Sequence, residues 1–445
     1  MITYDEAIEY LYGFIDYEKV SRYVYDAGTL NLDRMRGLLS RLGDPHRGLR
    51  CVHVAGTNGK GSSAAMIASV LRAAGYRVGL YTSPHLVTFR ERIRIGGKAI
   101  SRKSICLFVE RLRQATDQRA EPPEAGAFTF FEVWTALAFS YFAAEHVDFA
   151  VVEVGMGGRL DATNVVEPLV AVITPIGMDH AQKLGNTAAK IAREKAGIIK
   201  EEGTVIVARQ TPEVMEVIRS VCREHRARCL EVGRDVAFDG GSSSEEGQEF
   251  RVAALGGVCQ ELSIPLLGSH QIANAALAVG TAALLAQQGV AVSKEAVRQG
   301  LRAVRWPGRL QVVGHHPLIV LDGACNVHGA EQVRQSIQEA FAFNRLVLVL
   351  GMCNDKDVGG VYRAFEPLTD IVVLAQADNP RALSAACIAE RIAPSRAEVV
   401  LGDKVAEAIE RAQTLAAVDD LVLITGSLYV VGEAMIYFGL NAERI

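Results

Sequence analysis

A glycine-rich stretch near the start of the chain has the residue types and order of a phosphate-binding loop. The segment HVAGTNGKGSS (53–63) stands between an apolar run and a helical pattern. Its glycines let the backbone approach a ligand closely, and the N–H groups at a helix N-terminus attract anions. Lys60 adds a positive charge for terminal phosphates, and Ser62 or Ser63 can reach a bound Mg²⁺. The candidate nucleotide-binding residues of this loop are Thr57, Asn58, Gly59, Lys60, Gly61 and Ser62.

The spacing of this loop differs from the common pattern G-x-x-x-x-G-K-[ST]. Gly61 stands where a Ser or Thr is usual, and Ser62 follows one position later. A glycine-rich turn that only packs a helix on a strand is the alternative interpretation, but the order strand, glycine loop, Gly-Lys, helix favours the nucleotide site. Such a loop indicates a nucleotide and not a reaction, because kinases, motors and ligases share it.

Three further polar residues are expected at the ends of predicted strands. Glu153 ends the most apolar run of the chain (147–155), Ser83 follows the run 77–82, and His180 follows the run 169–174. Ligands of open α/β sheets bind at the carboxyl ends of the strands, and carboxylate oxygen suits Mg²⁺. A helix cap or an ion pair is the alternative for Glu153, and a structural histidine is the alternative for His180.

Lys195 lies on a predicted helix (187–199) that also carries Ile191. From the residues alone, the simpler interpretation is a solvated lysine that pairs with Glu194 or Glu201.

The apolar pattern predicts the scaffold that positions these residues. Short apolar runs alternate with helical patterns, which favours a parallel sheet covered on both faces. Residues 240–250 are interpreted as a turn-rich surface loop within a hairpin excursion. The strands expected in the first part are 51–56, 77–82, 147–155, 169–174 and 204–208, and the helices are 3–14, 31–42, 62–75, 131–145, 187–199, 270–288 and 293–303.

A chain of 445 residues suggests two or three domains at roughly 100–200 residues each. WPGR (306–309) is a Pro-Gly break after a helical pattern, and apolar runs alternate with helices again beyond it. We therefore interpret the chain as an α/β protein. A parallel-sheet phosphate-loop ATPase domain (1–305) is followed by a smaller Rossmann-like α/β domain (306–445).

The composition argues against several classes of partner. The net charge of −4 and the pI near 6.2 do not suggest nucleic acid or a membrane surface. The eight cysteines form no C-x-x-C pair, which suits reduced thiols. The N-terminus has no basic region of a signal peptide, and no apolar run approaches the ~18 residues of a membrane span. We expect a soluble, cytoplasmic monomer.

Ten short strings, taken together, resemble the successive signatures of the folylpolyglutamate synthase/dihydrofolate synthase family, in the Mur ligase superfamily. The strings are HVAGTNGKGS, YTSPHL, ERIRI, EVGMGGRLDATN, ITPIGMDH, IAREKAGIIK, GSHQIANAALA, WPGRL, LDGA and TGSLYVVGE. The resemblance implies that ATP and Mg²⁺ bind between the two domains. It also implies that ATP phosphorylates a folate or dihydropteroate carboxylate, and that the amine of L-glutamate attacks the acyl phosphate.

The resemblance also assigns roles to single residues. It places one Mg²⁺ on Ser83 and Glu153 and a second near His180. It also matches Lys195 to a lysine that the family carbamylates, which would make Lys195 a further oxygen ligand for Mg²⁺. Lys60, Glu153, His180 and Lys195 are then the expected catalytic residues. Asn274 should contact adenine, and Arg309 and Asp322 should reach the nucleotide from the second domain. The expected pterin-pocket residues are Thr129, Phe130, Phe131 and Glu132.

One position departs from the family pattern, which usually has histidine where this chain has Cys325. His328 stands three residues on as a possible substitute. Other classes are a Mur-type ligase for another carboxylate, a phosphate-loop ATPase or kinase, and a dinucleotide-binding oxidoreductase. Only 55 residues precede Gly56, which is too few for the sugar-nucleotide domain of a peptidoglycan ligase, and no G-x-G-x-x-G opens the first helix. The sequence leaves open whether dihydropteroate, folate or both are substrates.

Overall fold

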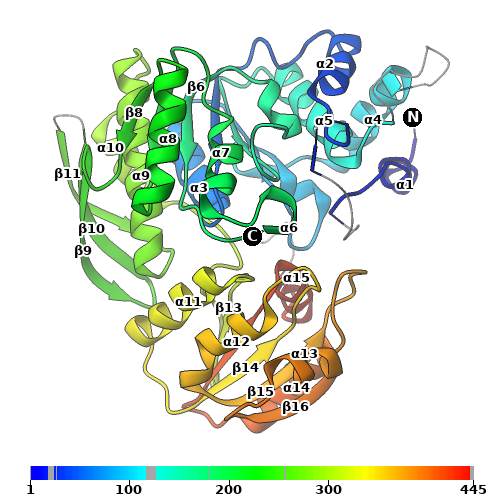
Figure 1. The fold of residues 1–445 in the computed structure, drawn as a ribbon, viewed down its shortest axis with the longest axis vertical. Helices are drawn as coiled ribbons and strands as arrows, with labels where there is room; N and C mark the ends of the chain where they lie inside the picture. Colours follow the sequence, from blue (N-terminus) through cyan, green and yellow to red (C-terminus); the bar gives the residue numbers. More distant parts are fainter. Residues whose placement is uncertain are drawn as a thin grey trace.

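Two α/β parts lie one above the other in the computed structural model (Figure 1). It describes residues 2–18, 25–26, 28–116, 127–179, 181–254 and 257–440. The first part is built on a sheet of eight strands in the order β4-β3-β2-β5-β1-β6-β7-β8. Its strands are β1 (Cys51–Ala55), β2 (Val78–Tyr81), β3 (Ile93–Ile95), β4 (Lys98–Ala99), β5 (Phe149–Glu153), β6 (Pro168–Ile173), β7 (Thr204–Val207) and β8 (Arg228–Glu231).

Six of these strands run parallel, as the apolar runs predicted, while β3 and β4 add an antiparallel edge beyond β2. Every residue of β1 and of β5 is buried, because helices cover both faces of the sheet. These helices are α1 (Tyr4–Tyr12), α2 (Leu32–Arg41), α3 (Lys60–Ala73), α4 (Arg102–Thr116), α5 (Phe130–Ala144), α6 (Ala181–Leu184), α7 (Ala188–Ala196), α8 (Pro212–Glu224), α9 (Ser269–Gln287) and α10 (Lys294–Arg302).

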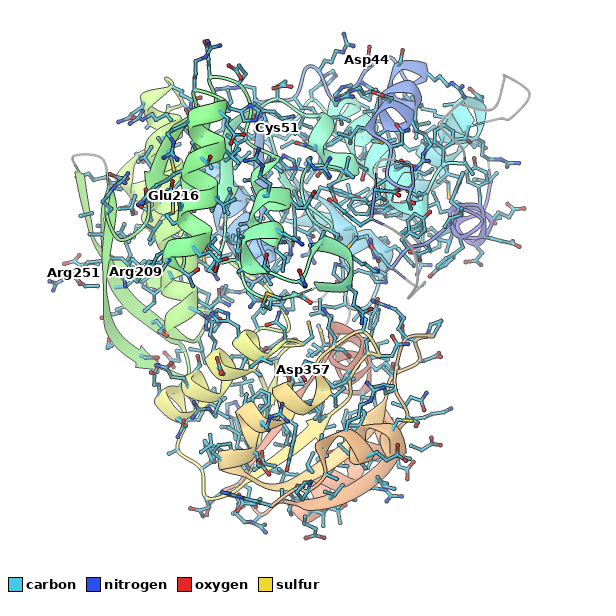
Figure 2. The ribbon with its side chains drawn as sticks, in the orientation of Figure 1. Asp44, Cys51, Arg209, Glu216, Arg251 and Asp357 are labelled. Carbon is cyan, nitrogen blue, oxygen red and sulfur yellow. The ribbon has the colours of Figure 1, made fainter. Side chains whose placement is uncertain are left out.

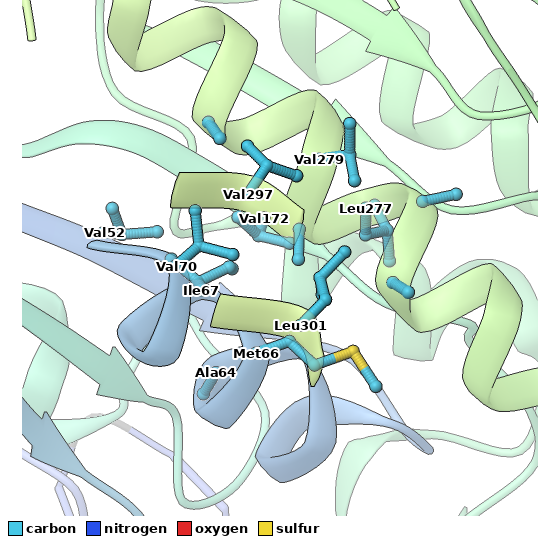
Figure 3. Packing of buried hydrophobic residues seen from close by; sticks show 14 of the residues in the cluster. Val52, Ala64, Met66, Ile67, Val70, Val172, Leu277, Val279, Val297 and Leu301 are labelled. Carbon is cyan, nitrogen blue, oxygen red and sulfur yellow. The ribbon is translucent and has the colours of Figure 1, made fainter. Parts of the chain in front are cut away.

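The core of the first part divides by sheet face. On one face, Val52 and Val172 pack against α3, α9 and α10, where Val70, Leu277 and Leu301 contribute to the cluster (Figure 3). Helices α2, α4 and α5 cover the other face over β5 and β1, and α7 and α8 cover it over β6 and β7. This packing fixes the strand ends that carry the candidate site.

The segment after β8 differs from the expectation. Residues 240–250 were expected as a turn-rich surface loop that forms a hairpin excursion. The hairpin is observed, but most of these residues belong to its two strands, with the turn confined to 245–246. The hairpin belongs to a three-stranded antiparallel sheet of β9 (Val236–Ser244), β10 (Gly247–Ala254) and β11 (Gly257–Ile264). Phe250 and Val252, two residues apart on β10, both point into the core against α9, and this alternation overrides the Gly/Ser-rich composition.

The second part has a six-stranded sheet in the order β12-β13-β17-β14-β15-β16, parallel except for β12. The fold class is therefore the predicted one. Its strands are β12 (Gln311–His315), β13 (Leu318–Leu321), β14 (Leu346–Leu350), β15 (Thr369–Gln376), β16 (Glu398–Lys404) and β17 (Leu421–Thr425), and its helices are α11 (Val327–Ala340), α12 (Val358–Phe365), α13 (Ala385–Ile392), α14 (Val405–Leu415) and α15 (Leu428–Tyr437). None of the helices in the described ranges is long and apolar enough to cross a membrane.

Contacts between the parts go beyond the connection at residues 303–310. Leu267 packs into the core of the second part, and so does Leu86, from the loop after β2. A side chain at Gly432 on α15 would meet the Leu86 carbonyl oxygen at 2.1 Å, so α15 and this loop touch closely. The division into residues 1–305 and 306–445 stays an interpretation, because the cores of the two parts share residues across it.

Candidate active site

The carboxyl ends of the first parallel sheet point toward the second part. In Figure 2, Cys51, the first residue of β1, lies on the side away from the second part, while Asp357, which caps α12, lies on the side near the first. A cleft with about 1300 Å³ of empty space lies between the two parts. All the residues expected to bind nucleotide line it: Thr57, Asn58, Gly59, Lys60, Gly61, Ser62, Asn274, Arg309 and Asp322.

The phosphate loop is held tightly between β1 and α3. The N–H groups of Thr57 and Asn58 donate to the Pro175 carbonyl at 2.9 and 3.3 Å. Gly59 has a φ of +82°, and a side chain there would lie 2.5 Å from Oδ1 of Asn274. Glycine is therefore required both by the backbone angle and by the close approach of α9.

The loop opens into the cleft on its ligand side. Of the two serines that could reach a cation, Ser62 lines the cleft, whereas Ser63 does not. Lys60 donates to the Thr57 carbonyl at 3.3 Å, which folds its ammonium group back over the loop. A glycine turn that merely packs a helix would not face a cleft in this way.

Glu153 is buried at the end of β5 and accepts a hydrogen bond from the Ser83 N–H at 3.2 Å. Burial raises the pKa of its carboxyl to about 7, although the charges of Lys60 and Arg309 act in the opposite direction. A carboxylate and a hydroxyl in one cleft are the hard oxygen donors that Mg²⁺ prefers, so these residues fit that ion.

A Mg²⁺ site here would depend on few protein ligands. The described residues contain no group of three or more His, Cys, Asp and Glu side chains that could hold a metal. Mg²⁺ commonly keeps several waters and takes the rest of its oxygens from one or two carboxylates and from substrate phosphates. The donor set of Glu153 and Ser83 therefore suits a metal that arrives with a nucleotide. Two further ligands were predicted: His180 lies outside the described residues, and Lys195 is buried at the phosphate loop.

Lys195 is not the solvated lysine of the simpler interpretation. It is 5% exposed, and its Nζ donates to the Gly56 carbonyl at 2.7 Å, directly behind the phosphate loop. Burial and the nearby charge of Lys60 lower the pKa of Lys195 to about 7, against the opposing charges of Asp179 and Asp161. Lys195 is not among the residues that line the cleft.

The two acids that were considered as partners of Lys195 are engaged elsewhere. Glu194 pairs with Arg159 at 2.9 Å, and Glu201 pairs with Arg226 at 2.7 Å. The interpretation of a lysine paired with one of them is therefore wrong.

A second pocket, with about 980 Å³ of empty space, adjoins the nucleotide cleft. The two share Ser83, Pro84, Gly155, Arg381 and Tyr429. Of the residues expected around a pterin, Thr129, Phe131 and Glu132 line this pocket. The ring of Phe131 covers Gly155, where a side chain would lie 2.5 Å from the ring. An aromatic face is thus available close to the point where the pockets meet.

Phe130 does not line this pocket. Its ring is buried in the core, stacked on Trp134 with ring centroids 6.1 Å apart and edge-on to Phe89. Successive residues on a helix point about 100° apart, so Phe131 and Phe130 on α5 cannot face the same pocket.

Glu132 lines the pocket, but its carboxylate is already occupied. It forms a buried ion pair with Arg34, with an N–O distance of 2.7 Å, and it accepts the Thr129 N–H in a capping box. These contacts indicate a structural role for Glu132 at the pocket wall.

Several charged residues of the site carry no motif in the sequence. Lys356 pairs with Asp179 across the cleft at 2.6 Å. Arg381 lines both pockets and contacts Asp355 at 3.3 Å and the Tyr429 hydroxyl at 3.0 Å. Lys356 follows β14 and Arg381 follows β15, so their positions after parallel strands were the only signal available.

The second part also touches the phosphate loop directly. The side-chain amides of Asn58 and Asn326 exchange two hydrogen bonds, at 2.9 and 3.2 Å. Nδ1 of His328 lies 3.1 Å from Nδ2 of Asn58. Cys325 lines the cleft, and burial raises the pKa of its thiol. The imidazole of His328 therefore lies near the phosphate loop. Cys325, which stands where the family usually has histidine, offers a protonated thiol.

Comparison with known proteins gives consistent matches along the chain. Residues 54–282 match the Mur ligase middle domain, and residues 308–428 match the Mur ligase, glutamate ligase domain. The dihydrofolate synthase/folylpolyglutamate synthase of Bacillus subtilis (strain 168) is 39% identical over 407 residues, which are 90% of this chain and 93% of that protein.

Solved structures agree with these matches. Folylpolyglutamate synthase of Mycobacterium tuberculosis, complexed with ADP, superposes with a TM-score of 0.89 at 36% identity, covering 98% of both chains. Escherichia coli FolC, in complex with DHPP and ADP, superposes with a TM-score of 0.86 at 32% identity, covering 100% of this chain and 99% of that one.

Proposed function

We propose roles for single residues from one premise: the chain belongs to the folylpolyglutamate synthase/dihydrofolate synthase family. It is an ATP-dependent ligase that adds L-glutamate to a folate or dihydropteroate carboxylate. The observation that carries the proposal is the meeting of the two pockets at Ser83 and Gly155. A nucleotide on the phosphate loop and a carboxylate from the adjoining pocket would face one another there.

The reaction needs the carboxylate oxygen to reach the terminal phosphorus of ATP. Phosphoryl transfer then yields an acyl phosphate and ADP. The amine of L-glutamate attacks the acyl carbon, forms the amide bond and loses a proton, and inorganic phosphate leaves. Positioning and charge stabilisation supply most of the catalysis in such transfers.

Lys60 has the charge and the position to offset the terminal phosphates during transfer. Asn274 contacts the phosphate loop from α9 and lines the same cleft, where we assign it to the adenine end. Arg309 faces the cleft from the second part. The buried carboxylate of Asp322 accepts the N–H groups of Leu310 and Ala324 at 3.0 and 2.8 Å, which fixes the strand end beside Arg309.

Glu153 and Ser83 would hold a first Mg²⁺, and His180 and a carbamate on Lys195 would serve a second. Bound Mg²⁺ offsets phosphate charge and orients the phosphate oxygens. Only the neutral amine of a lysine adds CO₂, and a pKa near 7 leaves a large neutral fraction at physiological pH. The buried setting of Lys195 therefore supports carbamylation without a separate activating base.

Closure of the two parts over the cleft would protect the acyl phosphate from water. Asp179 and Lys356 close the cleft by pairing across it, and Asn58 and Asn326 do the same at the phosphate loop. Excluding water prevents hydrolysis of the reactive intermediate.

The test measures phosphate release with ATP, Mg²⁺ and L-glutamate plus either dihydropteroate or tetrahydrofolate, and identifies the products by mass. Release that requires both the acceptor and L-glutamate, with a product heavier by one glutamyl residue, is the expected result. The acceptor that supports turnover defines which of the two activities the chain has. Phosphate release that is independent of both acceptors would overturn the assignment of the adjoining pocket.

A further inference from the structure

A separate pocket lies along α3 and shares no lining residue with the nucleotide cleft. It is bounded by α3, by β2 and β3, and by residues 303–306, which lead out of α10. Its polar lining consists of Ser69, Arg72, Arg94 and Arg305, and none of the acidic residues in the described ranges lines it. Nothing in the ligase reaction described above uses these three arginines.

Arg94 is the central group of this pocket. It is 8% exposed, and the one hydrogen bond from its guanidinium to the described residues runs from Nε to the Glu91 carbonyl at 3.1 Å. The carboxylate of Glu91 does not pair with it, because that carboxylate accepts the N–H groups of Leu86, Val87 and Thr88. Burial lowers the pKa of Arg94, while the charge of nearby Glu91 acts in the opposite direction. Its Nη1 and Nη2 groups donate to no described residue and are not among the fully enclosed atoms without a partner, so they reach the open space of the pocket, where an anion would accept from them.

Arg72 and Arg305 add two further positive charges at the exposed end of the pocket. Arg72 donates to the Gly96 carbonyl at 3.2 Å, and Arg305 donates to the Val304 carbonyl at 3.0 Å. Neither forms an ion pair with a described acidic residue. Elsewhere in the molecule buried arginines are neutralised, as in the pairs Arg34–Glu132 and Arg92–Glu18.

Trp306 lines this pocket and also packs on the phosphate loop. The indole lies over Gly61, where a side chain would meet the ring at 2.8 Å, and the Arg94 guanidinium lies 5.8 Å from the same ring. Arg94 and Trp306 also line a small cavity that extends to Gly61 and Glu153. An anion held by Arg94 would therefore contact a residue that packs on the phosphate loop.

We propose that this pocket, formed by Arg72, Arg94, Arg305 and Ser69, binds a small anion with two negative charges and ties the connection between the two parts to α3. Forked guanidinium groups match both phosphate and carboxylate oxygens, so the ligand class is a phosphate-type or dicarboxylate anion. The site differs from the nucleotide cleft in position and in residues. If an anion in this pocket favours one arrangement of the phosphate loop, it changes the affinity for nucleotide. Bound nucleotide then changes the affinity for the anion by the same factor.

The test uses the full chain saturated with Mg²⁺ and a non-hydrolysable ATP analogue, so that the phosphate loop is already occupied. Inorganic phosphate and succinate are titrated separately by calorimetry, which distinguishes a phosphate ligand from a dicarboxylate. One saturable site per chain is expected for at least one of them. Arg94→Met should weaken that binding about tenfold or more, as should the double variant Arg72→Met/Arg305→Met, because each loses charge-assisted hydrogen bonds.

Arg302→Met is the matched control, because Arg302 is exposed on α10 and lies outside the pocket. It removes the same charge and should leave anion affinity unchanged. The double variant keeps the test valid if Arg94→Met fails to fold, because Arg72 and Arg305 are both exposed. Absence of saturable binding of either anion, or equal binding by the wild type and the double variant, would overturn the proposal. Both outcomes are independent of ligase turnover.

Discussion

Lys60 and Lys195 both donate to backbone carbonyls of the phosphate loop, but their surroundings differ. Lys60 faces the cleft as a cation. Lys195 is buried behind Gly56 with a pKa near 7. Residue type is the same in both, so we expect burial to decide which lysine offsets phosphate charge and which can be carbamylated.

Lys60→Ala should reduce turnover by about 10²–10³-fold, the range for losing one preorganised group that stabilises transition-state charge. The measurement is steady-state ADP release at saturating substrates. Lys98→Ala is the matched control, since Lys98 is exposed on β4 away from the cleft. An unchanged rate in Lys60→Ala would remove the phosphate-loop assignment, provided that both variants unfold at the same temperature as the wild type.

Lys195→Met should abolish most ligase activity and yet stabilise the CO₂-free chain by about 1–4 kcal/mol at pH 7, because it removes a buried charge. The sign follows from the lowered pKa. The unfolded chain binds more protons than the folded chain between pH 7 and 10.5, so the penalty is full below pH 7 and fades as pH rises toward 10.5. Urea unfolding at pH 6.5 and 9.5 measures this difference.

Lys190→Met on the same helix is the control, because Lys190 is exposed and its loss should change neither activity nor stability at either pH. A ¹³C signal of a carbamate after addition of labelled bicarbonate should appear in the wild type and be absent in Lys195→Met. An active Lys195→Met variant without such a signal in the wild type would contradict the proposed carbamate.

At the residue scale, the sequence located the polar ends of strands better than it located the pocket walls. The phosphate loop, Ser83 and Glu153 were predictable because their chemistry follows from strand order. The sequence predicted Phe130 at the pocket wall, but Phe130 lies in the core. Its position depends on which face of α5 packs inward, and the motif does not specify that face. Arg381 could not be predicted, since an arginine in a loop has no local pattern that marks a cleft.

The strand–loop–helix unit around the phosphate loop is the element on which the site depends. Gly59→Ala should lose about 1–2 kcal/mol of stability from its left-handed backbone and should also bind nucleotide less tightly, because the added carbon meets Asn274. Gly75→Ala separates the two effects. Gly75 has a similar φ of +91° but no atom within 4 Å of the added carbon.

Gly75→Ala should therefore lose stability without losing nucleotide affinity. Fluorescence titration with an ATP analogue and thermal unfolding measure the two quantities on both variants. Equal nucleotide affinity in Gly59→Ala and Gly75→Ala would show that the close approach of α9 does not shape the binding site.

Among the elements, the long apolar strands and amphipathic helices were predictable and the short edges were not. The helix expected at 3–14 is observed as α1, and Thr3 and Glu6 form a capping box at its start. The short strands β3 and β4 were missed, because three and two residues give too little pattern. The strands at 240–250 were missed because Gly and Ser indicate turns when read alone, whereas in the fold they pair with neighbouring strands.

At the scale of the whole molecule, the site exists only where the two parts meet. Asp179 and Lys356 are 15% and 11% exposed and pair across the cleft. Lys356→Met should favour an open arrangement and raise the KM for ATP about tenfold, which corresponds to ~1.4 kcal/mol of lost closure. Small-angle X-ray scattering of the free chain should show a larger radius of gyration.

Lys404→Met is the control for this change, because Lys404 is exposed on β16 and outside the cleft. It should leave both the radius of gyration and the KM unchanged. A raised KM in Lys356→Met with an unchanged radius of gyration would mean that Lys356 acts on the nucleotide directly and not through closure. The sequence could predict two parts and a cleft. The string ITPIGMDH marks the loop that carries Asp179, but no motif marks the loop after β14 that carries its partner Lys356.

Two hydrogen bonds between the side-chain amides of Asn58 and Asn326 join the phosphate loop to the second part. Asn58 belongs to the phosphate loop. A phosphate that accepts from its amide would replace the hydrogen bond that Asn58 donates to Asn326, while the one that Asn326 donates to Asn58 can stay. Neutral amides that trade one partner for another change little in net free energy. The nucleotide can therefore enter the phosphate loop while the second part stays closed over it, held also by the Asp179–Lys356 pair.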